Sequence, residues 1–155
     1  MVPQNDEVWL AIRQQAAEDA AQEPVLSSFL HNTILNHDTL ERALAYHLAN
    51  KLYDANLQAI ALMELFTDAY EPGGEISRSM RADLVAIHER DPACRGYATP
   101  LLYFKGFHSL QSYRLAHWLW EQGRIPLALV LQSRISQVFG VDIHPAARLG
   151  KGILM

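Results

Sequence analysis

The spacing of hydrophobic residues changes at Gly140, and this change constrains the fold more than any other feature of the sequence. Before Gly140, hydrophobic residues recur every three or four positions, the period of an amphipathic α-helix. After it they recur every six positions, in two columns: Val141, Ala147 and Ile153, and Ile143, Leu149 and Met155. A six-residue period is typical of a parallel β-helix, in which each hexapeptide forms one side of a coil. The sequence therefore predicts a mainly α fold, with a helical domain over residues 1–139 and the first β-helix coils over residues 140–155.

Capping residues and helix breakers divide the first 139 residues into separate helices. Asn5 or Asp6 is a suitable cap for the first helix, and Pro24 suits the opening of the second. Asp38 followed by Glu41 predicts a capping box, in which each side chain accepts a hydrogen bond from an otherwise unpaired amide. Further helices are expected over about 56–70, 76–90, 103–120 and 125–139, with a loop from residue 91 to residue 100.

Composition places the chain among folded domains and argues against export. Of its 155 residues, 50% are hydrophobic and 19% are charged, so a hydrophobic core can form. Cys94 is the only cysteine, which excludes an intrachain disulfide and suits a reducing cytoplasm. We find no apolar stretch near the roughly 20 residues of a membrane span, and residues 1–7 lack the features of a signal peptide. A cytoplasmic location without membrane contact is therefore expected.

The charge of the chain is unevenly distributed along its length. Residues 1–72 contain eleven acids and three bases, whereas residues 73–155 contain six acids and ten bases. The overall charge of −4 gives no general attraction to nucleic acid. The basic half suits either an anionic ligand or an ordinary solvated surface, and the pattern leaves both open.

Other residue types that often carry chemistry give no clear signal here. The seven histidines are scattered without metal-binding spacing, so no metal site is expected. The aromatic residues between Tyr103 and Trp120 recur at helical spacing with few bases, which favours core packing over base stacking.

Several stretches of the sequence together resemble the N-terminal part of bacterial serine O-acetyltransferase. The resemblance covers about residues 7–155 and is carried by Ala49–Leu52, Arg90–Ala93, Thr99–Arg114, His117–Trp120 and Val141–Ala147. It implies a helical domain followed by a left-handed parallel β-helix, with acetyl-CoA as cosubstrate and no tightly bound cofactor. It also implies trimers of β-helices, paired into a hexamer by the helical domains, and a C-terminal tail that binds O-acetylserine sulfhydrylase. The resemblance favours an interface between trimers that uses hydrophobic stripes such as Leu40, Leu44 and Leu48, and the pattern alone leaves open whether this stripe faces the core of its own chain or a partner.

The resemblance assigns roles to two carboxylates. Asp142 matches the aspartate that orients the catalytic histidine, and Asp91 matches the carboxylate that binds the amino group of L-serine. Cysteine, the feedback inhibitor, competes for the same site. The catalytic histidine is expected a few residues beyond Met155, and His144 does not match it. We therefore expect the chain as given to be an inactive fragment of the enzyme that makes O-acetylserine for cysteine synthesis.

Two other functions are compatible with parts of the sequence. The chain suits a free-standing helical module for oligomerisation or regulation, since only about two hexapeptide coils follow the helices and about three are needed for a stable core. Another hexapeptide acyltransferase, with homoserine or a sugar as acceptor, is the third hypothesis. The matches around Asp91 and Asp142 argue against it, because a general hexapeptide enzyme needs neither.

Overall fold

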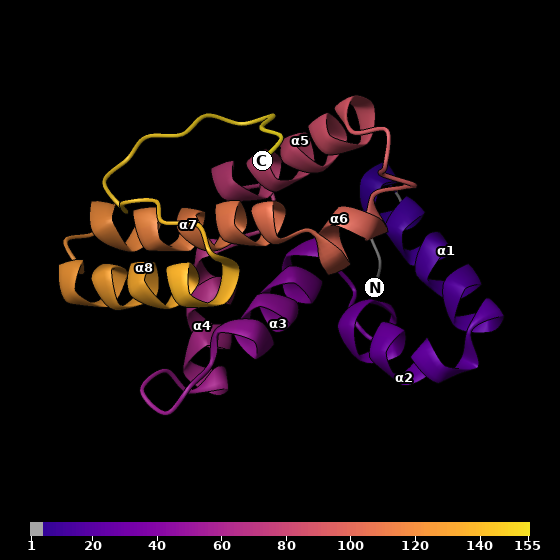
Figure 1. The fold of residues 1–155 in the computed structure, drawn as a ribbon, viewed down its shortest axis with the longest axis horizontal. Helices are drawn as coiled ribbons and strands as arrows, with labels where there is room; N and C mark the ends of the chain where they lie inside the picture. Colours follow the sequence, from indigo (N-terminus) through magenta and orange to yellow (C-terminus); the bar gives the residue numbers. More distant parts are fainter. Residues whose placement is uncertain (1–4) are drawn as a thin grey trace.

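A computed structural model describes residues 5–155 as a helical domain (Figure 1). Met1–Gln4 lie outside the described residues. They belong to the predicted first domain and to the stretch in which no signal peptide is expected. In chain order the elements are α1 (Glu7–Gln22), η1 (Pro24–Leu26), α2 (Ser27–Leu30), η2 (His31–Leu35), α3 (Leu40–Leu52), α4 (Ala59–Ala69), α5 (Glu75–Arg90), α6 (Ala98–Tyr103), α7 (Lys105–Glu121) and α8 (Ile125–Phe139). The predicted helical class is confirmed.

The first helix begins, and the last helix begins and ends, where the sequence predicts. The Asp6 carboxylate accepts a hydrogen bond from the Trp9 amide (3.2 Å), which satisfies one of the unpaired donors at the start of α1. Pro126 lies in the first turn of α8, where its missing amide costs nothing. Gly140 ends α8 with φ of 73°, a left-handed conformation that glycine adopts without steric penalty.

The capping box predicted at Asp38 is wrong by one residue. Thr39 has extended backbone angles and its hydroxyl accepts from the Arg42 amide (3.3 Å), so Thr39 caps α3. Glu41 is thereby rotated inward, where its carboxylate accepts hydrogen bonds from Ser77 Oγ (2.5 Å) and Arg81 Nη1 (2.6 Å) of α5.

Two other segments also differ from the predicted pattern. The second predicted helix is divided into a 3₁₀ turn (η1), one α-helical turn (α2) and a π-helical turn (η2). The loop predicted up to Pro100 contains the start of α6, in which Pro100 occupies the first turn. A proline is tolerated there because first-turn amides make no hydrogen bonds within the helix.

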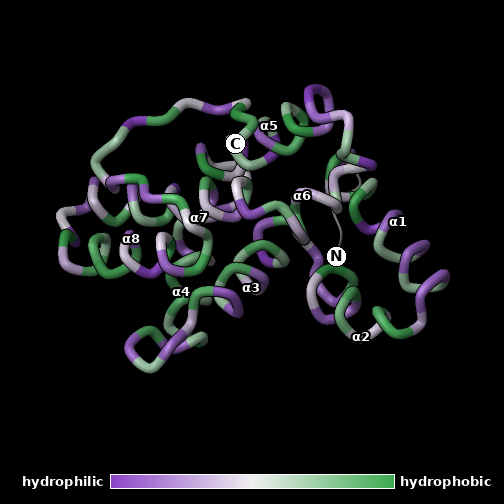
Figure 2. The backbone as a smooth tube through the Cα atoms, viewed as in Figure 1, coloured by the Kyte–Doolittle hydropathy of each residue, from purple (hydrophilic) through white to green (hydrophobic). Residues whose placement is uncertain are grey.

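The leucine stripe of α3 faces the core of this chain. Leu40, Leu44, Leu48 and Leu52 are each 0% exposed. The expectation that Leu40, Leu44 and Leu48 form an interface between trimers is therefore wrong, because these side chains are already covered within one chain. Figure 2 shows the alternation of hydrophobic and hydrophilic residues along the helices that produces this burial.

Helix α7 lies at the centre of the fold. It packs along α8 and also contacts α4, α5 and α6 (Figure 1). Its buried residues include polar ones on all sides, among them His108, Gln111, Ser112 and Arg114. A helix that is buried all round must satisfy such groups internally, which positions them for the contacts described below.

Residues 141–155, which we call the crossing segment, contain no β-strand. The segment leaves the end of α8, crosses α7 and ends beside α5 (Figure 1). Two predicted hexapeptide coils are thus not formed as strands within the described residues. A β-helix coil is stabilised by hydrogen bonds to the coils stacked on it, and here the backbone of the segment bonds to helix side chains instead.

Two buried histidines join α3, α6 and α7. The rings of His47 and His108 are 5.1 Å apart, and their Nε2 atoms donate to the carbonyl oxygens of Leu102 (3.1 Å) and Leu101 (2.7 Å). Burial lowers the pKa of His47 to about 4 and that of His108 to about 3, with Lys51 lowering both further. Both rings are therefore neutral near pH 7.

This pair predicts loss of stability in acid. Because both pKa values lie below the ordinary 6.5, the unfolded chain binds protons first as the pH falls. The stability present above pH 6.5 is then lost towards pH 4, with a slope of up to about 1.4 kcal/mol per pH unit for each histidine. His108→Gln is expected to lower the melting temperature at pH 7 but to flatten its decline between pH 7 and pH 4.5. His31→Gln, on the surface, is the control, and an unchanged decline in the His108 variant would contradict the prediction.

Candidate functional site

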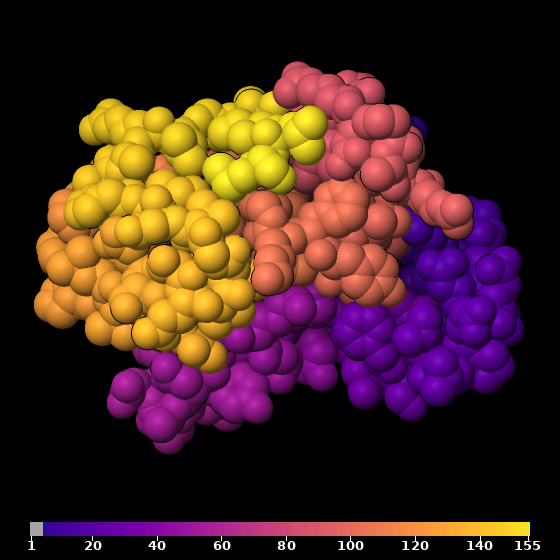
Figure 3. Space-filling view, in the orientation of Figure 1, coloured from indigo at the N-terminus to yellow at the C-terminus, as the bar shows by residue number. Residues whose placement is uncertain are grey.

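The candidate site lies where the crossing segment meets α5 and α7. The space-filling view shows the last residues resting against both helices (Figure 3). At the end of the segment, the backbone of Met155 approaches Gly106 so closely that a Cβ at that position would overlap the Met155 carbonyl group. The segment is therefore in close contact with the first turn of α7.

The carboxylate of Asp83, in α5, is the centre of this contact. Asp83 is 0% exposed. Its Oδ2 accepts from Gln111 Nε2 (2.7 Å) and Arg114 Nη2 (2.7 Å), both in α7. Its Oδ1 accepts from the backbone amides of Gly152 (2.8 Å) and Ile153 (3.0 Å). One buried charge thus binds two helices and the crossing segment, and its hydrogen bonds offset the cost of removing it from water.

Arg114 and two further side chains bind the carbonyl oxygens of the crossing segment. Arg114 Nη2 donates to Gly150 (2.9 Å), Arg90 Nη1 to Gly152 (3.0 Å) and His117 Nδ1 to Pro145 (2.7 Å). These contacts, spread over residues 145–152, hold the segment along much of its length.

The Tyr113 hydroxyl contacts the middle of the segment. It donates to the Ala147 carbonyl oxygen and accepts from the Leu149 amide (3.3 Å). Burial raises the pKa of Tyr113, so the phenol keeps its proton and remains a donor near neutral pH. Its ring stacks on that of His117, with centroids 5.6 Å apart.

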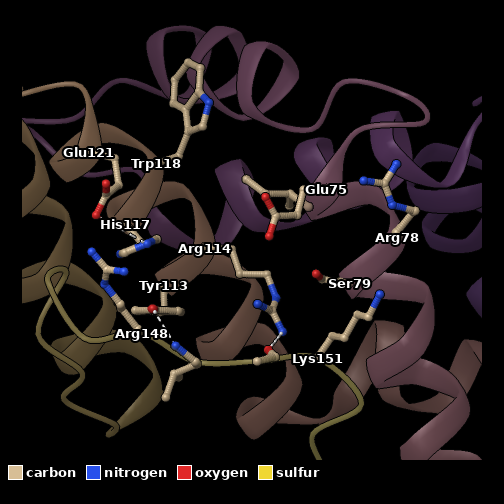
Figure 4. Close-up of a pocket in the computed structure, with 13 residues that line it drawn as sticks. Glu75, Arg78, Ser79, Tyr113, Arg114, His117, Trp118, Glu121, Arg148 and Lys151 are labelled. Atoms are coloured by element: carbon tan, nitrogen blue, oxygen red, sulfur yellow. Dashed lines mark hydrogen bonds and ion pairs between the residues drawn. The ribbon is translucent and has the colours of Figure 1, made fainter.

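A groove of about 740 Å³ is enclosed between α5, α7 and the crossing segment (Figure 4). Arg78, Arg148 and Lys151 contribute positive charge to its walls, and Glu75 and Glu121 contribute negative charge. The mixture suits a polar ligand, and neither Asp91 nor Asp142 lines the groove.

Asp91 directly follows α5. Its backbone amide ends the helix by donating to the Ile87 carbonyl oxygen (2.9 Å), and its Oδ1 accepts from the Ala93 amide (2.9 Å). Within residues 5–155, Oδ2 has no hydrogen-bond donor. The side chain is half-buried, and the preceding residue, Arg90, holds Gly152.

Asp142 lies near the start of the crossing segment, just after the end of α8. It is exposed, and its Oδ1 accepts from Gln132 Nε2 of α8 (2.9 Å). Figure 1 shows the ends of α5 and α8 well apart, so this chain does not bring Asp91 and Asp142 together. His144 points its ring at Trp120, with centroids 5.0 Å apart, and its Nδ1 accepts from the Ala146 amide (3.0 Å).

The residues that hold the crossing segment were missed at the sequence level. Asp83 carried a usable signal, because it lies three residues after Met80 and four before Ile87, on the hydrophobic face of its helix. An acid on such a face must have buried partners. The pattern did not show where those partners lie, since Gly152 and Ile153 are about 70 positions away along the chain.

Comparisons with known proteins identify the family of this chain. The model of the family "Serine acetyltransferase, N-terminal" matches residues 8–112. Serine acetyltransferase 2 of Arabidopsis thaliana is 52% identical over 99% of this chain and 47% of its own length, and the Haemophilus influenzae enzyme is 51% identical over 96% and 55%. The Neisseria gonorrhoeae enzyme in complex with serine has a TM-score of 0.91 and 52% identity over 96% of this chain and 62% of its own.

The chain belongs to the serine acetyltransferase family, and it spans about half the length of the curated relatives it matches. Further structures of serine acetyltransferases in complex with CoA and with cysteine have TM-scores of 0.91 each. Among residues 5–155 we find no cluster of metal-binding side chains and no helix with the length and hydrophobicity needed to cross a bilayer.

The contacts of Tyr113 yield a prediction about the crossing segment. Tyr113→Phe removes two hydrogen bonds to it, which at about 1 kcal/mol each makes local opening about thirtyfold more frequent. Limited trypsin digestion followed by mass spectrometry is expected to show correspondingly faster cleavage after Arg148 and Lys151. The control is Tyr103→Phe, whose ring is exposed on α6. Equal cleavage rates in the two variants would contradict the role of Tyr113.

Proposed function

We propose that these residues form the helical part of a serine O-acetyltransferase, which transfers the acetyl group of acetyl-CoA to the L-serine hydroxyl. The product, O-acetylserine, is used for cysteine synthesis. The family match over residues 8–112 carries the proposal. The likeness to serine acetyltransferases in complex with serine, CoA and cysteine supports L-serine and acetyl-CoA as substrates and cysteine as feedback inhibitor. Acetyl-CoA acts as a cosubstrate rather than a tightly bound cofactor.

Asp91 binds the amino group of serine in this proposal. The Ala93 amide fixes Oδ1, and Oδ2 is left to accept from a ligand. A carboxylate at this position suits an ammonium group, because charge-assisted hydrogen bonds are about twice as strong as neutral ones. The end of α5 gives the carboxylate a rigid support.

Asp142 orients the histidine that acts as general base. The imidazole takes the proton of the serine hydroxyl, the hydroxyl oxygen attacks the thioester carbonyl carbon, and the thiolate of CoA leaves and receives the proton. A carboxylate behind the imidazole fixes its tautomer and stabilises the imidazolium. The hydrogen bond from Gln132 holds Asp142 ready for this contact.

The serine site is completed by β-helix coils and by neighbouring subunits. Two observations support this: Asp91 and Asp142 are apart within one chain, and the relatives are about twice as long. We accordingly propose trimers of β-helices that pair into hexamers, with residues 140–155 as the start of each β-helix. The partner O-acetylserine sulfhydrylase and the cytoplasmic location follow from the same family resemblance.

The 155 residues alone are expected to release no CoA from acetyl-CoA and L-serine. No histidine among them contacts Asp142, and an unactivated serine hydroxyl is a poor nucleophile. The measurement is thiol release, with the Haemophilus influenzae enzyme as positive control. Serine-dependent turnover by the purified chain would contradict the proposal that its site is incomplete.

A chimera tests the two carboxylates. Residues 1–155 replace the matched part of the Haemophilus influenzae relative, which restores the remainder of the enzyme. Asp91→Asn is expected to raise KM for serine by about 10- to 100-fold, the value of a hydrogen bond to a charged group. Asp142→Asn is expected to lower kcat by about 10²-fold or more with a smaller change in KM.

Asp68→Asn, on the exposed surface of α4, is the control for both variants. A folded chimera that assembles but is inactive would favour a helical oligomerisation module instead. Unchanged kinetics in either carboxylate variant would remove the role given to that residue.

A further inference from the structure

We infer that Asp83 is a positioning residue of the serine site, because it fixes the crossing segment to the helix that carries Asp91. This inference rests on the proposed function. Asp83 touches no substrate in it and acts only through the backbone of Gly152 and Ile153.

The two oxygens of Asp83 have separate tasks. Oδ2 is occupied by Gln111 and Arg114, which join α5 to α7, and Oδ1 is occupied by the amides of Gly152 and Ile153. One oxygen of Asp83 therefore binds the segment, and the other binds the neighbouring helix. Arg114 also donates to the Gly150 carbonyl oxygen, so the substitution that affects Oδ2 and leaves the contacts of the segment in place is one at Gln111.

Two side chains of α5, Asp83 and Arg90, bind the backbone of Gly152, and we call this pair of contacts the clamp. The Gly152 amide donates to Asp83, and its carbonyl oxygen accepts from Arg90 (3.0 Å). Asp83 and Arg90 are seven residues apart, which places them two turns apart on one face of the helix. Gly152 has φ of 74°, in the left-handed region, and this conformation turns its two polar groups towards that face.

The clamp at Gly152 lies between the groups that perform the proposed reaction. Asp142 begins the crossing segment, and the family resemblance places the catalytic histidine a few residues after Met155. Asp91 is the neighbour of Arg90 in the chain. Because Asp91 directly follows α5 and Gly152 is bound to α5, the bound amino group keeps a fixed distance from the segment that leads to the catalytic histidine. Misplacement by about 1 Å in such an arrangement can cost about 100-fold in rate.

Asp83→Asn is the informative substitution because it preserves shape. The amide of asparagine presents a donor where the carboxylate has an acceptor. In one orientation this donor faces the Gly152 and Ile153 amides, and in the other it faces Arg114. Gln111→Leu is the matched control, since it removes one hydrogen bond on the Oδ2 side and leaves both contacts of Oδ1.

The first experiment measures amide hydrogen exchange in the 155-residue chain. Asp83→Asn is expected to accelerate exchange at Gly152 and Ile153 by about tenfold or more relative to the α8 amides, as expected for losing hydrogen bonds to a charge. In Gln111→Leu these two amides are expected to change only as much as the rest of the fold. Equal acceleration of exchange at Gly152 and Ile153 in both variants would overturn the inference that Asp83 holds the segment.

The second experiment measures kinetics in the chimera. Asp83→Asn and Arg90→Gln are each expected to lower kcat about tenfold or more, with KM for acetyl-CoA unchanged. The kcat of Gln111→Leu is expected to stay near that of the parent chimera. Since both act on Gly152, the double variant is expected to lose much less than the product of the single losses. Multiplicative losses, or an equal loss in Gln111→Leu, would overturn the positioning role. An inactive parent chimera would instead overturn the proposed function, and the positioning role with it.

Discussion

A buried charge has to be paired, and in this protein the pairing of Asp83 determines how the end of the chain is arranged. Its carboxylate is shielded from water and is stable there only because Arg114, Gln111 and two backbone amides surround it. Removing one partner of such a buried pair typically costs about 3–5 kcal/mol, whereas the complete set is close to neutral. The packing of α5 on α7 and the path of the crossing segment are thus set by one requirement.

The position of α7 explains why buried polar groups that need partners occur at the centre of the fold. Between residues 107 and 116, a helix packed against α4, α5, α6 and α8 has no solvent-facing side on which to place its polar residues. His108 donates a hydrogen bond to a carbonyl oxygen of α6, and Arg114 and Tyr113 donate to carbonyl oxygens of the crossing segment. The helix thereby acts as a scaffold whose polar side chains specify what packs against it.

The sequence allowed the helices to be predicted well, because local signals determine them. Asp6 caps α1 and residues 125–139 form α8, as periodicity and capping chemistry indicated. Thr39 was missed because a threonine beside an aspartate offers two equally good caps, and the backbone angles decide between them. The candidate site was predicted less well. Asp91 and Asp142 were recognised through the family resemblance, but the residues that support them act over long distances along the chain, which periodicity does not record.

The clamp at Gly152 also has a consequence for the order of folding. Its partners are separated by 69 residues for Asp83 and 62 for Arg90, whereas most helix contacts are local. Long-range contacts form late, since closing a large loop costs entropy before any contact repays it. The segment finds its acceptor and donors only after α5 and α7 have met in the correct register. Docking of the segment therefore reports that the helices have assembled correctly, because a misregistered pair of helices would separate the α5 contacts at Gly152 from the α7 contacts of Tyr113 and Arg114.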